Sequence, residues 1–201
     1  DFLKNAVAAF DKDKQIGAIQ GKLLRLKADD KNLDKTQIID NTGLVLFKNR
    51  RIIARGQGQK DSGQFSRSEE IFGVDGAAPI YRRAALEDIK IYLDQKCEYL
   101  DEDFYMYKED VDLAWRLRLA GWKAYYEPTA IAWHARTAGD SAATNYFAIV
   151  KERLKINKAA KYLAFKNQRL MQIKNEKPAL LVRHLPWFLP KEIASWVFAL
   201  L

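Results

Sequence analysis

The sequence predicts an α/β domain followed by a basic, helical C-terminal segment. Short apolar runs bounded by Gly, Asn and Asp alternate with stretches of helical periodicity, which is the pattern of an α/β fold. A chain of 201 residues that is 48% hydrophobic and 30% charged can bury a sizeable core and is too apolar to be disordered. The single cysteine, Cys97, excludes a disulfide scaffold and suits a reducing compartment.

The elements predicted in the first part of the chain are short. Residues 2–10 have helical spacing, and Asp1 precedes them as a candidate cap. A turn at Asp40-Asn41 is expected between two of the strands that follow. Residues 55–68 are rich in Gly, Gln and Ser, so a mobile loop is expected there. The strands are expected at residues 16–24, 38–39, 43–47 and 51–54.

The clearest helix is expected at residues 109–120, after a shorter one at 84–89. Acidic residues crowd its first turn, and Gly121 follows its last residue. Strands are expected at 122–126 and 130–134, interrupted at Pro128. From about residue 145 the chain is predicted to be helical, with one side formed by Tyr162, Phe165, Leu170 and Ile173.

The net charge of +8 is confined to the end of the chain. Residues 151–201 contain 11 Lys and Arg against 3 Asp and Glu, and they run into an apolar segment that carries Trp187 and Trp196. Basic residues beside Trp and Phe are typical of a segment at an anionic membrane surface. A membrane-spanning helix is not expected, because Arg183, Pro186, Pro190, Lys191 and Glu192 interrupt the apolar run. The alternative is a tail that packs on its own domain with solvated lysines.

Candidate chemistry is concentrated between residues 105 and 134. A carboxylate at position 110 would begin a helix, where the helix dipole favours the ionised form and where it could accept a proton from an attacking hydroxyl. The alternative is that Glu109, Asp110 and Asp112 only stabilise the first turn. His134, at the end of a predicted strand, is either structural or a metal ligand.

Four motifs occur along the chain: residues 39–43, the loop that holds Gly56, Gly58, Asp61 and Gly63, residues 75–83, and residues 104–122 with Glu127-Pro128 and Ala132-Trp133-His134. Together and in this order they resemble family 2 glycosyltransferases, and most closely the bacterial rhamnosyltransferase-like group. The resemblance extends over about residues 1–175. It implies a partial GT-A fold with a mixed sheet, in which residues 1–145 form the acceptor-side part and residues 146–201 a basic amphipathic helical tail.

The resemblance also implies roles for individual residues. Asp110 would be the catalytic base and Glu109 its acidic partner, while His134 would help to hold a divalent cation, Mg²⁺ or Mn²⁺, on the donor diphosphate. Small side chains at Gly76, Ala77 and Ala78 would form the floor of the sugar site. Asp112 would buttress the helix start. Arg116 would orient the acidic cluster or form a plain surface salt bridge.

The reaction implied is inverting transfer from a nucleotide-diphospho-sugar to a hydroxyl acceptor. That acceptor would be a glycan or lipid-linked molecule at the inner face of the cell membrane, in polysaccharide or glycolipid synthesis. The family's Asp-X-Asp motif and nucleotide-binding half do not precede Asp1, and Asp11-Lys-Asp13 lies at the wrong point in the order, so a truncated chain is expected.

Three rival interpretations remain. The first is a fragment that is inactive without the missing half, and the second is a non-catalytic membrane-surface or partner-binding module. The third, a nucleic-acid-binding tail, is disfavoured because the sequence has no base-stacking motif and the basic segment is apolar around its tryptophans.

Overall fold

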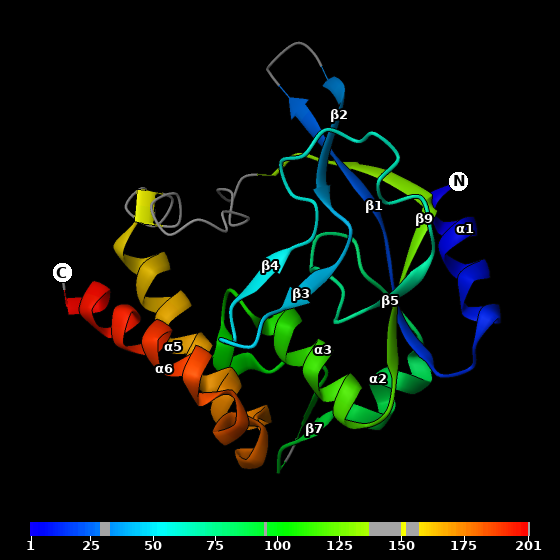
Figure 1. The fold of residues 1–201 in the computed structure, drawn as a ribbon. Helices are drawn as coiled ribbons and strands as arrows, with labels where there is room; N and C mark the ends of the chain where they lie inside the picture. Colours follow the sequence, from blue (N-terminus) through cyan, green and yellow to red (C-terminus); the bar gives the residue numbers. More distant parts are fainter. Residues whose placement is uncertain (29–32, 95, 137–149, 152–156, 201) are drawn as a thin grey trace.

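The computed structural model describes residues 1–28, 33–94, 96–136, 150–151 and 157–200. Its centre is a five-stranded mixed sheet in the order β2-β1-β9-β5, with β6 also paired to β1 (Figure 1). The pair β1–β9 is parallel and the other pairs are antiparallel. The predicted α/β class with a mixed sheet is confirmed. The strands are β1 (Ile16–Ala28), β2 (Leu33–Asn41), β5 (Glu69–Ile71), β6 (Ile80–Tyr81) and β9 (Lys123–His134).

Helices cover both faces of the sheet. Helix α1 (Phe2–Ala9) packs on one face, where Ala6 and Ala9 meet Ile19 of β1. Helices α2 (Arg83–Ile89) and α3 (Glu109–Leu119) pack on the other face, where Leu113 and Leu117 belong to a core with Ala18, Ala124 and Tyr126. The remaining short elements are the pairs β3 (Leu44–Leu46) with β4 (Ile52–Ala54) and β7 (Ile91–Tyr92) with β8 (Cys97–Glu98), and the 3₁₀ turns η1 (Phe10–Lys12) and η2 (Glu102–Phe104).

Two expectations for the strands are corrected. Strand β2 continues through Asp40 and Asn41, so the break before β3 lies at Thr42 and Gly43, after the position expected. Strand β9 continues past Pro128, and the irregularity there appears as a shift in register: Gly21 pairs with Glu127, whereas Lys22 pairs with Ile131. A bulge absorbs the proline without ending the strand.

The glycine-rich segment 55–68, where a mobile loop is expected, is hydrogen-bonded to the sheet at several points. The N–H of Gly58 donates to the Ile39 carbonyl at 2.9 Å, and the N–H of Asp61 donates to the Gln37 carbonyl at 2.8 Å. The Tyr126 hydroxyl donates to the Phe65 carbonyl at 3.0 Å. These hydrogen bonds tie parts of the segment to β2 and β9, while residues 58–60, 62–64 and 66–67 are exposed.

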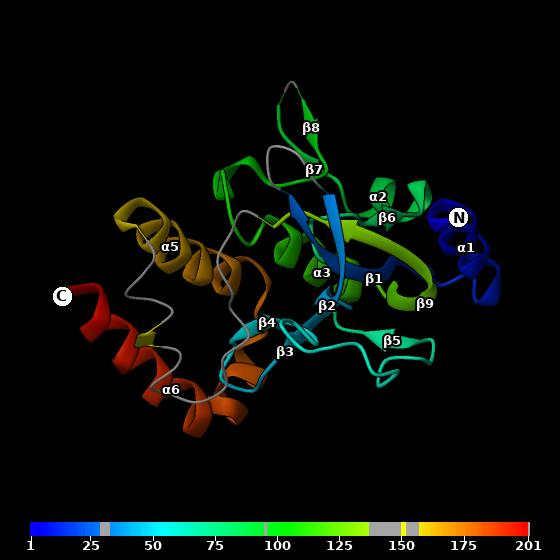
Figure 2. The same ribbon diagram turned by 90° about the horizontal axis from the view of Figure 1, so that it is seen from above.

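Two long helices form a layer on the side of the molecule away from α1 (Figure 2). They are α5 (Lys158–Asn175) and α6 (Pro178–Leu200). Figure 1 shows them beside the β3–β4 pair and α3. Among the described helices, none combines the length and the apolar character that crossing a bilayer requires.

The face of α5 that packs on the domain differs from the prediction. Tyr162 is 64% exposed and Ile173 is 82% exposed, so they do not lie on the packed side. Three of the four buried residues are amides, namely Asn167, Gln168 and Asn175, and the fourth is Met171. The predicted side was wrong for Tyr162 and Ile173, because buried amides occupy most of the packed side, where Met171 joins a hydrophobic cluster that Leu170 also contacts.

Candidate active site

Asp110 lies in the first turn of α3 with its side chain half-buried. Its Oδ1 accepts a hydrogen bond from the Val111 N–H at 2.8 Å, and its Oδ2 accepts one from the Gly76 N–H at 3.1 Å. Both donors are backbone groups without a net charge. The carboxylate is thus held in place at a helix N-terminus while no cation neutralises it through these contacts.

The surroundings of Asp110 make it a stronger base than an ordinary aspartate. Burial raises the pKa of Asp110 to about 6, and the negative charges of Asp75 and Glu109 add to this effect, while the two backbone N–H groups oppose it. One carboxylate oxygen of Glu109, Oε2, is buried and has no hydrogen-bond partner among the described residues. Burial, together with the charge on Asp110, also raises the pKa of the nearby Tyr81 hydroxyl. These acidic groups form a cluster that can receive a proton at neutral pH.

The small-residue turn meets Asp110 from across the site. The N–H of Asp75 donates to Oε1 of Gln20, a fully buried residue of β1, at 2.8 Å. The N–H of Ala77 donates to Oδ1 of Asp75 at 3.0 Å, which closes the turn. Gly76 and Ala77 are exposed and Ala78 is half-buried, so the turn presents a surface of small side chains next to the carboxylate. Gly76 thus lies beside Asp110, so the predicted floor of the sugar site and the predicted base can contact the same substrate.

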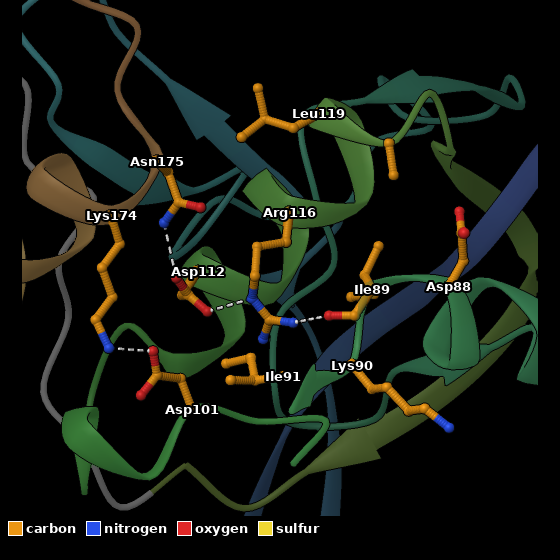
Figure 3. Close-up of a pocket in the computed structure, with 11 residues that line it drawn as sticks. Asp88, Ile89, Lys90, Ile91, Asp101, Asp112, Arg116, Leu119, Lys174 and Asn175 are labelled. Carbon is orange, nitrogen blue, oxygen red and sulfur yellow. Dashed lines mark hydrogen bonds and ion pairs between the residues drawn. The ribbon is translucent and has the colours of Figure 1, made fainter. Parts of the chain in front are cut away.

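Asp112 and Arg116 lie on a different side of α3 and bond to each other. The buried Asp112 accepts hydrogen bonds from Nε of Arg116 at 2.8 Å and from Nδ2 of Asn175 at 2.7 Å. The guanidinium also donates to the carbonyls of Ile89 and Tyr99, each at 2.7 Å. Figure 3 shows this network in the wall of a cavity of about 570 Å³, where Lys174 also pairs with Asp101. The network joins α3 to α2 and α5, and Arg116 pairs with Asp112 in the interior and forms no plain surface salt bridge.

His134 is the last residue of β9 and belongs to a separate cluster. Its Nδ1 lies 2.9 Å from Oδ2 of Asp40, and Nε of Arg136 donates to the other oxygen of Asp40 at 2.7 Å. Asp40 is fully buried in β2. A carboxylate behind one imidazole nitrogen is the usual support for a histidine whose other nitrogen binds a metal.

The residues present do not form a metal site by themselves. Within the described ranges, no group of three or more His, Cys, Asp or Glu residues is placed to hold an ion. His134 therefore offers one ligand with suitable support, and the other ligands would have to come from elsewhere.

The two candidate groups are attached to different parts of β1. Gln20 holds the turn beside Asp110, whereas Arg25 pairs with His134. Five residues of strand separate these points, which corresponds to about 16 Å at ~3.3 Å per residue. Neither Asp110 nor His134 lines the cavity of Figure 3.

Sequence reasoning missed two parts of this region. Asn175 lies 63 residues from Asp112, and no local pattern connects them. Asp40 is 94 residues from His134, although it belongs to residues 39–43, one of the motifs that resemble family 2 glycosyltransferases. The available signal was Asp40 itself, because an acidic residue that follows the apolar pair Ile38-Ile39 in a strand requires a polar or cationic partner when it is buried.

Comparison with known proteins gives one match. The family model described as "Glycosyltransferase like family 2" matches residues 1–155, which is most of the 201-residue chain and includes Asp110 and His134. No curated protein and no solved structure matches the chain. The order of motifs, the mixed sheet and the acidic cluster at the start of α3 agree with this match, and the chain belongs to glycosyltransferase family 2.

Proposed function

We propose that this chain is an inverting glycosyltransferase with Asp110 as its catalytic base. Membership of the family establishes glycosyltransferase activity in general, with a nucleotide-sugar donor and an acceptor. The observation that carries the proposal is the Asp110 carboxylate, which is fixed by two backbone N–H groups and has a pKa of about 6. Such a group is ionised at neutral pH and is basic enough to take a proton from a hydroxyl.

In the proposed reaction, Asp110 removes the proton of the acceptor hydroxyl as its oxygen attacks the anomeric carbon of the donor. The new glycosidic bond forms on the face opposite the leaving nucleoside diphosphate, so the configuration inverts. The bond between the sugar and the diphosphate breaks, and the proton remains on Asp110. Gly76, Ala77 and Ala78 form the floor under the sugar, because small side chains let the substrate approach the backbone.

A divalent cation, Mg²⁺ or Mn²⁺, belongs to the proposal as a cofactor of the donor. His134 is its proposed protein ligand, with Asp40 holding the ring. When bound, such an ion offsets the charge that develops on the departing diphosphate. Because the described residues supply one supported imidazole and no complete ligand set, the diphosphate itself is proposed to complete the coordination.

The outer face of α6 supports a position at an anionic membrane surface on the cytoplasmic side. Large apolar side chains on this helix are exposed, and the exposed Arg183 lies among them. This combination suits a helix that lies in the headgroup region. The acceptor would then be a lipid-linked or glycan hydroxyl in cell-surface polysaccharide or glycolipid synthesis, as in the rhamnosyltransferase-like group. The exposed residues are Leu180, Val182, Leu185, Trp187, Leu189, Ile193, Trp196 and Val197.

Release of nucleoside diphosphate tests the proposed reaction. The full chain is incubated with a panel of UDP-, GDP- and dTDP-sugars, Mn²⁺ and a bacterial glycolipid extract, and release is compared between wild type and Asp110→Asn. Asp11→Asn, which changes an exposed acid of η1 in the same way, is the matched control. Acceptor-dependent release by wild type and Asp11→Asn but not by Asp110→Asn supports the proposal. Equal release by all three contradicts it.

A second candidate is a module that does not transfer sugar by itself and acts by binding a membrane surface or a partner. The observation that favours it is the missing cluster of metal ligands in the described part of the chain. Calorimetric titration of UDP, GDP and dTDP with Mn²⁺ separates the two, since a self-sufficient transferase binds one of them. Flotation with anionic vesicles, measured against retention on DNA, tests the membrane surface.

A further inference from the structure

The loop that leads into α3, residues 104–108, has an unusual backbone. Tyr105, Tyr107 and Lys108 have φ values of 59°, 71° and 71°, although none of them is glycine. Left-handed backbone is unfavourable for residues with a Cβ atom and persists only where the surroundings impose it. A hydrogen bond inside the loop, from the Met106 N–H to the Phe104 carbonyl at 2.6 Å, spans Tyr105, and further contacts from outside the loop hold the rest of this backbone.

Asn167 of α5 provides the restraint. This residue is fully buried, and its Nδ2 donates to the carbonyl oxygens of Phe104, Met106 and Tyr107 at 2.8, 2.7 and 2.7 Å. Its Oδ1 has no partner among the described residues, so the hydrogen bonds of this side chain are directed to the loop. The two N–H donors of this one amide group are thus shared among three carbonyl oxygens of the loop, so at least one of the hydrogen bonds is bifurcated.

The loop carries two kinds of group that matter for transfer. Lys108 is the N-cap of α3, so the conformation of the loop determines where Glu109 and Asp110 begin the helix. The side chains of Tyr105, Met106 and Tyr107 point away from the core, and Tyr105 is 81% exposed. Exposed tyrosines in the loop that precedes a base offer flat, amphipathic faces to a hydroxyl-bearing ring.

We infer that Asn167 is a positioning residue for the transfer reaction. It holds the 104–108 loop in its left-handed conformation, which places the Asp110 carboxylate and presents Tyr105 and Tyr107 to the acceptor. Helix α5, which follows the sheet in the chain, then contributes to the arrangement of the catalytic groups. The inference rests on the proposed function of Asp110.

The same helix contains a control for simple docking. Gln168 is the next residue, it is buried, and its Nε2 donates to the carbonyl of Arg50 at 3.0 Å, in the turn between β3 and β4. Asn167→Asp and Gln168→Glu each replace a buried amide donor by a carboxylate of the same shape. Both changes weaken the docking of α5, but only the first removes a restraint on the 104–108 loop.

The test measures kcat, the KM for donor and acceptor, the Tm, and hydrogen exchange of the loop amides in the full chain. We expect both variants to lower the Tm, while only Asn167→Asp lowers kcat by roughly 10²-fold and raises the acceptor KM, as misplaced catalytic groups do. Exchange in residues 104–108 should accelerate in Asn167→Asp alone, with the donor KM unchanged. Asn167→Ala, which removes the donors without adding charge, replaces Asn167→Asp if that variant does not fold.

The outcomes separate this inference from the proposed function. Wild-type kcat in Asn167→Ala, beside an inactive Asp110→Asn, overturns only the inference. The inference is also overturned if the Asn167 and Gln168 variants lose kcat equally, each in proportion to its decrease in Tm. Full turnover by Asp110→Asn overturns the proposed function and the inference with it.

Discussion

Asp110 and Asp112 stand two residues apart in the first turn of α3, yet their surroundings are opposite. Asp112 is buried, and its oxygens bind Arg116 and Asn175. Asp110 is half-buried, binds two backbone N–H groups, and lies near the negative charges of Asp75 and Glu109. One carboxylate is neutralised by the protein and the other is left as a base.

The comparison shows that a first-turn acid can serve either the helix or a reaction, and that its neighbours decide which. A carboxylate whose lone pairs are taken by Arg and Asn side chains contributes to the framework that joins α3, α2 and α5. A carboxylate whose pKa is raised by burial and like charges is costly to the fold and available to a substrate.

The largest effect is expected at Asp110. Asp110→Asn should lower kcat by about 10²- to 10⁴-fold, because the amide cannot accept the proton of the acceptor hydroxyl. The Tm should not fall, since the variant removes a buried charge without a cationic partner. Rates and thermal melts of the same preparation check this. If Asp110→Asn is partly unfolded at the assay temperature, and the unfolded fraction explains the lower rate, Asp110 is a structural residue like Asp112.

Asp112→Ala should instead destabilise the fold. Removal of this carboxylate leaves Arg116 largely buried beside an amide and carbonyls, which should cost about 3 kcal/mol of unfolding free energy. Urea denaturation measures the change. The control is Arg83→Ala, which breaks a long, exposed pair with Glu87 and should leave the curve in place. An unchanged midpoint for Asp112→Ala would contradict its framework role.

Gly73 and Gly76 test the difference between the packed side and the proposed substrate side of α3, because the first lies against Ala114 and the second against Asp110. A Cβ atom on Gly73 would lie 2.3 Å from the Cβ of Ala114, whereas one on Gly76 would lie 3.7 Å from the Cβ of Asp110, an ordinary contact. Gly73→Ala should therefore cost about 1–3 kcal/mol of stability. Gly76→Ala should fold normally and raise the donor KM, because the floor of the sugar site is narrowed. If Gly73→Ala melts like Gly76→Ala, and Gly73→Ala alone raises the donor KM, the roles assigned to these two glycines are refuted.

The smallest expected effect is on pH dependence. Because the pKa of Asp110 is raised to about 6, kcat/KM should fall as the pH decreases through about 6 and the base becomes protonated. The unfolding free energy should change in the opposite direction, because protonation of Asp110 is easier in the folded chain than in the unfolded chain. The stabilisation that results is complete below the ordinary pKa of 3.8 and is lost as the pH rises through about 6. Unfolding curves of wild type and Asp110→Asn between pH 4 and pH 8 measure this difference, which should be absent from the variant.

Local patterns determined much of the framework. The helix expected at residues 109–120 is α3, Glu109–Leu119, and the helices expected near residues 2–10 and 84–89 are α1 and α2. These elements were predictable because helical periodicity, acids in a first turn and a glycine after the last turn act within a few residues. The position of Asp110 at the start of a helix followed from the same signals.

Tertiary structure alone decided which groups meet. Gly76 and Asp110 are 34 residues apart, and Asn167 binds carbonyls about 60 residues earlier in the chain. Apolar spacing pointed to the wrong face of α5, because three buried amides dock this helix and a hydrophobicity pattern counts amides as solvent-facing. Sequence periodicity reports which side of an element is apolar, whereas the choice of a hydrogen-bond partner depends on distances that exist only after the chain has folded.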